Sequence, residues 1–588
     1  MASAARRIGA SKHAVAAIAA LIVSTSTPAF AAAPPEWTQK AAEIAAPWPG
    51  LQETDGRFRD YVIARDPTDD RDDYGDPMLG YGLLQTAVRT GDAALADSAL
   101  RALEYSLDRA ARSPSTQVFH QLAVVSAYNV ARERYPSHAV FQSARARWED
   151  VLRRIEVYRI GKRAVTNKSI VETVLLLELL RSGLSSDVPG SALADRAGTD
   201  AAVRRFLSSD LPRAAKPYER GGRAVLGDMP LLPPSYHALS IGVLGRAIEL
   251  LGADAPSAAR SLLRRATEAS VASAAPDGEV AYHGRSQAQA WTLTLAAHGA
   301  EVAAVQPGAS GRAVHYRGLA RRAVANLIAR YPTGPEGFLV TPSLAQSIPA
   351  AIPGLDEYVA ATSYTGLTLS ALEWAIAAAG DGSAASPRSG AVVVGSGTGS
   401  WATARAGESW FAVKRARTSV RDLRYDTGFV ALKVLRGGRW RDAMPLRPRT
   451  LKGDQSAGPI LSGGGVPEFT EFKAAKGGRV IGRGGFRTKT GRWLRRGVTF
   501  TFAPTACGAR MTWNARKGES YTYSGFFAGQ PSIGTGSIND AQQQIRFGQR
   551  ITAKRQDGYS SASDAELQRV IARFKRSGAG SASIEICD

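Results

Sequence analysis

Apolar residues recur every three or four positions over most of the chain before residue 380, a spacing that places them on one face of a helix. Turn signals such as Thr90-Gly91-Asp92 separate the segments. The expected helices are Met78–Arg89, Ala93–Arg112, Thr116–Arg134, Ala139–Tyr158, Ser169–Ser182, Ala201–Leu207, Ser235–Leu251, Ala255–Ala274, Ser286–Ala304, Tyr316–Ala329 and Tyr364–Ala378. No strand-like run interrupts them. Paired helices of this length close as a ring or stack as a solenoid, and the fixed-period consensus of solenoid repeats is missing. We therefore predict an α/α toroid, an incomplete barrel, over residues 35–378.

The pattern changes after a Gly- and Ser-rich linker at residues 379–390. From residue 391 to 588 apolar residues alternate with polar ones, and aromatic residues and glycines are frequent. This pattern predicts a C-terminal antiparallel β-sandwich domain, so the fold class is α+β multidomain. The expected strands are Ala391–Val394, Ser400–Ala406, Ser409–Lys414, Phe429–Leu435, Val498–Phe502, Arg510–Trp513, Ser520–Phe527 and Ile584–Cys587, with mobile loops at Gly453–Gly465 and Lys473–Arg483.

Residues 1–31 have the composition of a secretory signal peptide. Arg6, Arg7 and Lys12 precede the short apolar run Ala14–Val23, and Ala29-Phe30-Ala31 fits a cleavage site. The run is too short to span a bilayer comfortably, so we expect a secreted protein without stable membrane insertion.

The chain has two cysteines, Cys507 and Cys587, which in an oxidising compartment are expected to form a disulfide that holds the C-terminal strand to its sheet. With two cysteines and no Cys-x-x-Cys pair, we expect no structural zinc site, and nothing indicates a cofactor. The sequence does not decide whether a structural calcium is bound.

The formal net charge of +22 points to an anionic partner. The sequence shows no basic arm, zinc finger or aromatic RNA-binding motif, and secretion further disfavours nucleic acid. An acidic polysaccharide remains as the expected substrate. The sequence does not indicate the oligomeric state.

Three clusters carry candidate chemistry. In the first, Ser169 and Glu172 form an S-x-x-E capping box, which places Asn167 and Lys168 just before a helix N-terminus, where an anion is favoured. Alternatively, Asn167 is an ordinary turn residue with no role in binding. In the second, Tyr236 and His237 follow a proline pair, and the helix N-terminus should keep the imidazole neutral.

The third cluster lies between two helices, at residues 276–289. Asp277-Gly278 predicts a turn and Ser286 a helix cap, but these do not account for Tyr282, His283, Arg285 and Gln287 in one short loop. Tyr364 opens the last long helix, where it either packs or contacts substrate.

Asn, Arg, Tyr and His together suit β-elimination at a uronic acid. An amide or guanidinium neutralises the carboxylate, a phenol or imidazole removes the C5 proton, and an acid protonates O4. The predicted catalytic residues are Asn167, Tyr236, His237, Tyr282 and Arg285, and the predicted substrate-binding residues are Lys168, His283, Gln287 and Tyr364.

The combination of signal peptide, toroid and β domain resembles the toroid polysaccharide lyases, which include the heparinase II/III-like, chondroitin/hyaluronate and alginate lyases. Thr166-Asn167-Lys168-Ser169 is similar to the Asn-bearing loop of the heparinase-like enzymes, with Lys168 in place of the usual His. Asp277-Gly278 followed by Tyr282 is similar to their loop with a catalytic Tyr. Those enzymes also use a His from the β domain, which this chain lacks. The resemblance implies cleavage of a uronic-acid polymer.

Two other classes stay open. A glycoside hydrolase on the same toroid needs two carboxylates, and the available ones are Asp72, Asp73, Asp76, Asp228 and Glu279. A non-catalytic glycan-binding or cell-wall protein would use the basic surface with the β-domain residues Trp401, Trp410, Trp440 and Trp493.

Overall fold

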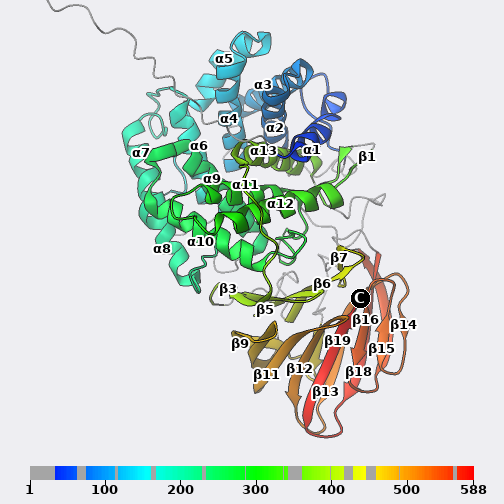
Figure 1. Cartoon of the computed structure of the whole chain (residues 1–588). Coiled ribbons are helices and arrows are strands. Elements are labelled where there is room, and N and C mark those ends of the chain that lie inside the picture. The colour runs from blue at the N-terminus through cyan, green and yellow to red at the C-terminus, as the bar shows by residue number, and fades with distance from the viewer. Residues whose placement is uncertain are drawn as a thin grey trace, which may run out of the picture.

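A computed structural model describes residues 33–61, 74–112, 117–160, 167–227, 233–284, 286–334, 337–341, 360–397, 399–415, 428–444, 458–488, 490–560 and 566–588. The predicted signal peptide lies outside these ranges. Helices occupy the first part of the described chain and strands the second (Figure 1). No described helix combines the length and the apolar character needed to cross a bilayer.

The helices agree closely with the predicted segments. They are α1 (Pro35–Ala45), α2 (Gly75–Thr90), α3 (Ala93–Arg112), α4 (Val118–Arg134), α5 (Ala139–Leu152), α6 (Asn167–Arg181), α7 (Arg196–Arg205), α8 (Leu211–Ala215), α9 (Pro234–Leu251), α10 (Ser257–Ser273), α11 (Ala290–Ala304), α12 (Ala313–Arg330) and α13 (Ala361–Ala378). Helices α1 and α8 were not predicted. A two-residue strand pair, β1 (Thr333–Gly334) with β2 (Gly337–Phe338), also interrupts the helical part.

Six of the described helices form an inner ring. Helices α2, α4, α6, α9, α11 and α13 contact one another in that order, and α13 packs back against α2. The predicted α/α toroid is therefore confirmed, although its inner ring is closed where an incomplete barrel was expected. Glycines allow the close approach: a Cβ at Gly366 of α13 would overlap the backbone of Leu79 in α2, and one at Gly242 of α9 would overlap Leu295 in α11.

The inner helices run parallel because an outer helix returns the chain between successive members of the ring. The packing register confirms this direction for α2 and α13: Gly366 meets Leu79, and three residues further along both helices Gly82 meets Leu369. All six inner helices therefore begin at the same end of the ring, which we call the N-terminal mouth.

The segment between α13 and the first strand of the β domain packs along α12. The Ala385 N–H donates to the carbonyl of Val314 at 2.8 Å, and Arg322 donates to the carbonyl of Ala385 at 2.9 Å. Arg388 pairs with Glu268 at 2.5 Å. A segment that looks like a flexible linker by composition is thus held to the toroid.

The β domain contains three antiparallel sheets in the described residues. A five-stranded sheet is formed by β3 (Gly390–Val394), β4 (Trp401–Ala406), β5 (Ser409–Lys414), β6 (Gly428–Arg436) and β7 (Arg439–Asp442). An eight-stranded sheet has the order β14 (Ser532–Ile533), β15 (Ser537–Asn539), β16 (Gln544–Phe547), β19 (Gly580–Cys587), β12 (Gly508–Ala515), β11 (Trp493–Thr505), β10 (Arg479–Arg487) and β9 (Val466–Ala475). A four-stranded sheet has the order β17 (Thr552–Ser560), β18 (Glu566–Lys575), β13 (Ser520–Ala528) and β8 (Gly458–Leu461).

The five-stranded sheet lies between the helices and the eight-stranded sheet (Figure 1). One of its faces packs on the toroid through Trp401 and Trp410, and the other packs on the large sheet through Phe411 and Phe429. Burial on both faces explains why β5 is buried at every residue instead of alternating. The eight-stranded sheet is buried on one face only, where it joins the core of the β domain. Its opposite face is open to solvent and polar.

The prediction of a mobile loop at Lys473–Arg483 is wrong. These residues belong to the β9–β10 hairpin, whose turn contains Gly477 and Gly478 with φ of 69° and 68°. Two adjacent residues of positive φ are typical of a tight hairpin. The pair Gly477-Gly478 therefore marks the turn between two strands and not a long loop. The polar residues of these strands face solvent on the outer side of the sheet. Of the other predicted loop, residues 458–461 form β8, and residues 453–457 lie outside the described residues.

The predicted disulfide between Cys507 and Cys587 is present, and it joins residues 80 positions apart. It ties β19, at the C-terminal end of the chain, to the start of β12, where Gly508 pairs with Cys587. The one group of potential metal ligands that cluster within the described residues adds Glu585 to these two cysteines, whose sulfurs are bonded to each other.

Replacing both cysteines by serine is expected to lower the free energy of unfolding by about 2–4 kcal/mol, because the unfolded chain regains the entropy of an open loop. Urea unfolding with and without a reductant measures this. Reductant should destabilise the natural chain and leave the double variant unchanged; equal sensitivity of both would contradict the structural role.

Candidate active site

The N-terminal mouth gathers six helix starts at one end of the ring. Unpaired backbone N–H groups and the helix dipole make each start favourable for negative charge, so the mouth as a whole favours an anion. Asn167 and Lys168 are the first two residues of α6 at this end. Asn167 is buried, and its Oδ1 accepts the Lys168 N–H at 2.9 Å. Its Nδ2 makes no hydrogen bond to any described residue and remains available as a donor, while Lys168 is exposed.

Aromatic side chains stand on both sides of α6 in the ring. On one side, Tyr74 before α2 stacks on Phe119 of α4 with centroids 5.5 Å apart, and it meets Tyr364 of α13 edge-on at 6.5 Å. On the other side, Tyr236 of α9 meets Trp291 of α11 edge-on at 6.2 Å. A polar group between aromatic walls is the usual composition of a small-molecule site.

The segment before α11 is strained. Ser286 has φ of 58° and Ala288 has φ of 51°, and no other non-glycine residue in the described ranges has a positive φ. Such conformations cost on the order of 1 kcal/mol each and cluster at functional sites. The predicted helix cap at Ser286 is wrong, because α11 begins only at Ala290. Gln287 and the nearby His283 are both buried, and the His283 ring meets Trp401 of the β domain edge-on with centroids 5.8 Å apart.

Farther along the inner helices from the N-terminal mouth, the polar side chains bond to one another. Asn129 of α4 donates to the backbone carbonyl of Glu178 in α6 at 2.8 Å, and Arg246 of α9 pairs with the Glu178 carboxylate at 3.0 Å. His298 of α11 lies 3.0 Å from Glu249. These groups satisfy one another, so they act in stability, and the N-terminal mouth is the better candidate site.

Tyr282 does not lie open to the mouth. Its side chain is buried, its hydroxyl donates to the Ser273 carbonyl at 2.9 Å, and it accepts the indole N–H of Trp401 at 3.0 Å. Burial raises the pKa of Tyr282 well above its usual value, which disfavours a tyrosinate. This geometry contradicts the predicted role as base. Tyr282 fastens the five-stranded sheet to the end of α10, and its predicted neighbour Arg285 lies outside the described residues.

His237 is also committed to the core. Its Nδ1 accepts the Leu226 N–H at 3.1 Å, and its Nε2 donates to the Ala266 carbonyl at 3.1 Å. Burial lowers the pKa of His237 to about 4, so the ring is neutral, as the sequence predicted. With both nitrogens bonded to backbone, however, no lone pair faces a substrate. The predicted catalytic role is contradicted by these partners.

His237 should make the protein acid-sensitive. Its pKa of about 4 in the folded chain lies below the value of 6.5 for a free histidine, so the unfolded chain binds the extra proton first. Stability is therefore lost as pH falls from about 6.5 towards 4, by about 3 kcal/mol from this group. We expect His237→Gln to be less stable at pH 7 and to lose less stability on acidification, as measured by urea unfolding at several pH values. Parallel pH curves for both proteins would contradict this.

The carboxylates of the third cluster hold the two domains together. Lys433 of β6 is buried and lies 2.7 Å from both Asp277 and Asp442. Arg330 of α12 lies 3.1 Å from Asp442 and 3.4 Å from Glu279. Glu279 is thus engaged in a buried ionic network, which makes it unsuitable as a hydrolase carboxylate.

The predicted capping box is absent. Helix α6 begins at Asn167, two residues before Ser169. The Glu172 carboxylate is fully buried and accepts backbone N–H groups of Tyr158, Arg159 and Ile160 at 2.6–3.0 Å. Glu172 therefore anchors the chain that follows α5. The polar residues at the start of α6 are Asn167 and Lys168.

The structure adds His120 and Gln121 to the candidates. Both are buried in the first turn of α4, which neighbours α6 in the ring. The sequence contained a signal, since His120 is one of few histidines and stands near a helix start. Its position at the mouth followed only from knowing that α4 belongs to the inner ring.

The other predicted residues are distributed as follows. Asp72, Asp73 and Asp228 lie outside the described residues, and Asp76 accepts the Phe58 N–H at 2.7 Å. Trp401 and Trp410 are buried between the domains, and Trp440 packs beneath Arg405. Trp493 is partly exposed on the large sheet.

The sequence matches no protein-family model and no curated protein. Among solved structures, the chain is similar to a mutant of heparan sulfate lyase HepC from Pedobacter heparinus at 11% identity, covering 94% of this chain and 82% of that chain with a TM-score of 0.41. It is also similar to the GH76A α-1,6-mannanase from Salegentibacter sp. HEL1_6 at 12% identity, covering 58% and 99% of the two chains with a TM-score of 0.40. The unsaturated glucuronyl hydrolase from Bacillus sp. GL1 shows 15% identity, with 57% and 93% covered and a TM-score of 0.34. Likenesses this distant leave the function to be argued from the site.

Proposed function

We propose that this protein is a secreted polysaccharide lyase that cleaves a uronic-acid polymer by β-elimination at the N-terminal mouth. The observation that carries the proposal is that six helix starts lie at one end of the ring, where the Asn167 amide at the start of α6 stands in the ring between the Tyr74 and Tyr236 aromatic groups. This arrangement suits a sugar ring that carries a carboxylate. The net charge of +22 favours attraction of an acidic polymer, and the disulfide suits an oxidising compartment.

In the proposed reaction the Asn167 amide and Lys168 hold the uronic carboxylate and make its C5 proton more acidic. Tyr236, in the first turn of α9 beside α6, acts as a tyrosinate, takes that proton and becomes a neutral phenol. The positive end of α9 stabilises the tyrosinate before the transfer. The C5–H electrons form the C4–C5 double bond as the C4–O4 bond breaks, and His283 or His120 protonates O4. Gln287 and Tyr364 bind neighbouring sugars.

The test is a screen of uronic-acid polysaccharides for the ultraviolet absorbance of a conjugated, unsaturated product. We expect absorbance with at least one polymer and its loss in Asn167→Ala. Arg439→Ala, an exposed residue of the β domain, should retain activity. Cleavage without a rise in absorbance would replace the lyase by a hydrolase, and the absence of cleavage of every polymer would overturn both.

The hydrolase alternative rests on Asp60 and Asp76. Asp60 is half-buried and accepts both the N–H and the hydroxyl of Thr362 at the start of α13, at 2.8 and 2.9 Å. Asp76 is half-buried at the start of the adjacent helix α2. Asp60 precedes α2 and is bonded to the start of α13, and Asp76 stands in the first turn of α2, so two carboxylates, the minimum for glycoside hydrolysis, are present at this end of the ring. Both already act as acceptors for backbone N–H groups, which favours structural roles and leaves the lyase as the better proposal.

A further inference from the structure

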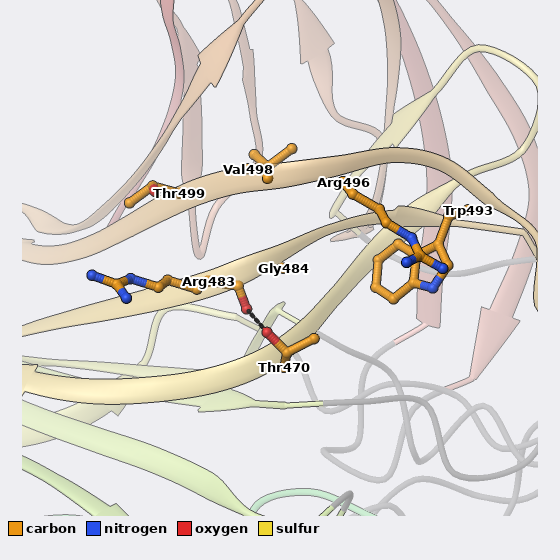
Figure 2. A pocket seen from close by; sticks show the side chains of 8 residues that line it. Thr470, Arg483, Gly484, Trp493, Arg496, Val498 and Thr499 are labelled. Atoms are coloured by element: carbon orange, nitrogen blue, oxygen red, sulfur yellow. Dashed lines mark hydrogen bonds between the residues drawn. The ribbon is translucent and has the colours of Figure 1, made fainter.

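A second polar site lies in the β domain, away from the N-terminal mouth. A pocket of about 390 Å³ opens on the outer face of the eight-stranded sheet, over β9, β10 and β11 (Figure 2). Its lining residues are Thr470, Arg483, Gly484, Trp493, Arg496, Gly497, Val498 and Thr499. The lining includes no acid, histidine, cysteine or tyrosine, so the pocket can bind but has no acid–base pair for catalysis.

The pocket is formed by two irregularities in adjacent strands. In β9 the pairing skips Thr470, whose hydroxyl donates to the Arg483 carbonyl at 3.1 Å. In β11 it skips Gly497, which has φ of 70°. Both bulges flank Gly484 of β10, where a Cβ would overlap the Glu468 carbonyl oxygen. The floor of the pocket therefore carries no side chain, and bulges of this kind redirect the neighbouring side chains.

Charge and aromatic surface meet at one end of the pocket. The guanidinium carbons of Arg496 and Arg487 lie 5.3 and 5.5 Å from the centre of the Trp493 ring. Arg487 is neutralised by Glu468 at 2.7 Å. Arg496 and Arg483 are exposed, and neither side chain forms an ion pair or hydrogen bond with any described residue. An unpaired guanidinium, that of Arg496, thus lies over the Trp493 ring, and the unpaired Arg483 lies at the other end of the pocket (Figure 2).

We propose that this pocket is a non-catalytic subsite for a short segment of an acidic polysaccharide. Trp493 stacks on the apolar face of one sugar ring. Arg496 beside it and Arg483 at the other end of the pocket pair with carboxylate or sulfate groups along the polymer, for which guanidinium is well suited. The hydroxyls of Thr470 and Thr499 add polar contacts on the same face. The pocket volume is at the small end for ligand sites, which matches a few sugars of a longer chain.

The subsite rests on the proposed function for its class of ligand: it would bind the same acidic polymer as the N-terminal mouth but would not cleave it. Its consequence is to hold a long chain on the protein while another part of the chain reaches the mouth, so that the effective concentration of substrate rises for polymers and not for short oligomers. The KM for a polymer should therefore depend on Trp493, while the kcat for a short oligosaccharide should not.

The experiment measures binding of uronic-acid oligosaccharides by calorimetry on the full chain. We expect Trp493→Ala and the double variant Arg483→Ala/Arg496→Ala to weaken binding by about tenfold or more. The double variant Arg439→Ala/Arg516→Ala removes the same charge from exposed positions elsewhere and should bind as the natural chain does. Dextran, a neutral polymer, should not bind.

Equal losses in both double variants would reduce the site to general electrostatic attraction and overturn the proposal, as would unchanged binding in Trp493→Ala. Tighter binding of a single-stranded DNA oligomer than of any glycan would assign the pocket to nucleic acid instead. Glycan binding through Trp493 without any cleavage activity would support the subsite and reject the lyase. Cleavage that produces an ultraviolet-absorbing product but is unaffected on every polymer by Trp493→Ala would support the lyase and reject the subsite.

Discussion

Replacing Tyr236 by phenylalanine is expected to lower kcat for elimination by about 10²- to 10⁴-fold, with KM nearly unchanged. The substitution removes the phenol oxygen that takes the C5 proton and keeps the ring that meets Trp291 at 6.2 Å. Steady-state absorbance assays on the most active polymer give both constants. A fall in KM alone, or no change in kcat, would remove Tyr236 from the reaction.

Tyr282→Phe provides the matched control. It also removes one phenol oxygen, but that oxygen is bonded to Ser273 and Trp401 between the domains. We expect kcat to stay within a few-fold of the natural value and the unfolding temperature to fall, since the Trp401 indole N–H and the Ser273 carbonyl lose a partner. A loss of kcat without a loss of stability would restore Tyr282 as the catalytic tyrosine.

Replacing Lys433 by methionine is expected to destabilise the protein by about 3–5 kcal/mol, because removing one partner of a buried ion pair leaves the others unpaired. Lys433 is 1% exposed and lies 2.7 Å from both Asp277 and Asp442. The nearby carboxylates hold the pKa of Lys433 above its usual value despite burial, so the charged form is the stable one. Calorimetry of the full chain should show the loss.

Arg436→Met is the control on the same strand. Arg436 is partly exposed and pairs with the exposed Glu408 at 3.3 Å and with Asp588 at 3.1 Å, and each of these surface pairs is expected to contribute less than about 1 kcal/mol. Adding Asp277→Asn to Lys433→Met should restore part of the lost stability, because it removes the unpaired carboxylate. An equal effect of the Lys433 and Arg436 variants would show that the network does not secure the domains.

The clearest sequence signals were those of local periodicity and turns. The helix Ala93–Arg112 has the predicted bounds, and α9 and α13 start within three residues of their predicted positions. Helical spacing and turn residues are local properties, so these elements could be found without neighbours. The hairpin at Gly477-Gly478 was missed because its outward residues are polar and its inward ones include glycines, which hides the alternation.

The candidate residues were harder to rank. Asn167 and Tyr236 were selected because they stand at helix starts, and the structure places both at the mouth. Tyr282 and His237 had the same appearance in sequence, yet their polar atoms are bonded to backbone or to Trp401. A residue type near a turn does not reveal which partner its polar atoms will meet, since those partners lie 29 and 119 positions away.

By itself the amino-acid sequence determined the helical and β parts, the disulfide and the excess of positive charge, because each depends on composition or on the period of apolar residues. Only the tertiary structure decided which helices form the inner ring, and hence which helix starts meet at the mouth. It also decided that the Asp277–Tyr282 segment secures the domain contact and that Trp493 is left at the surface. These outcomes depend on packing between elements far apart in the chain, where burial and available hydrogen-bond partners select one role for each side chain.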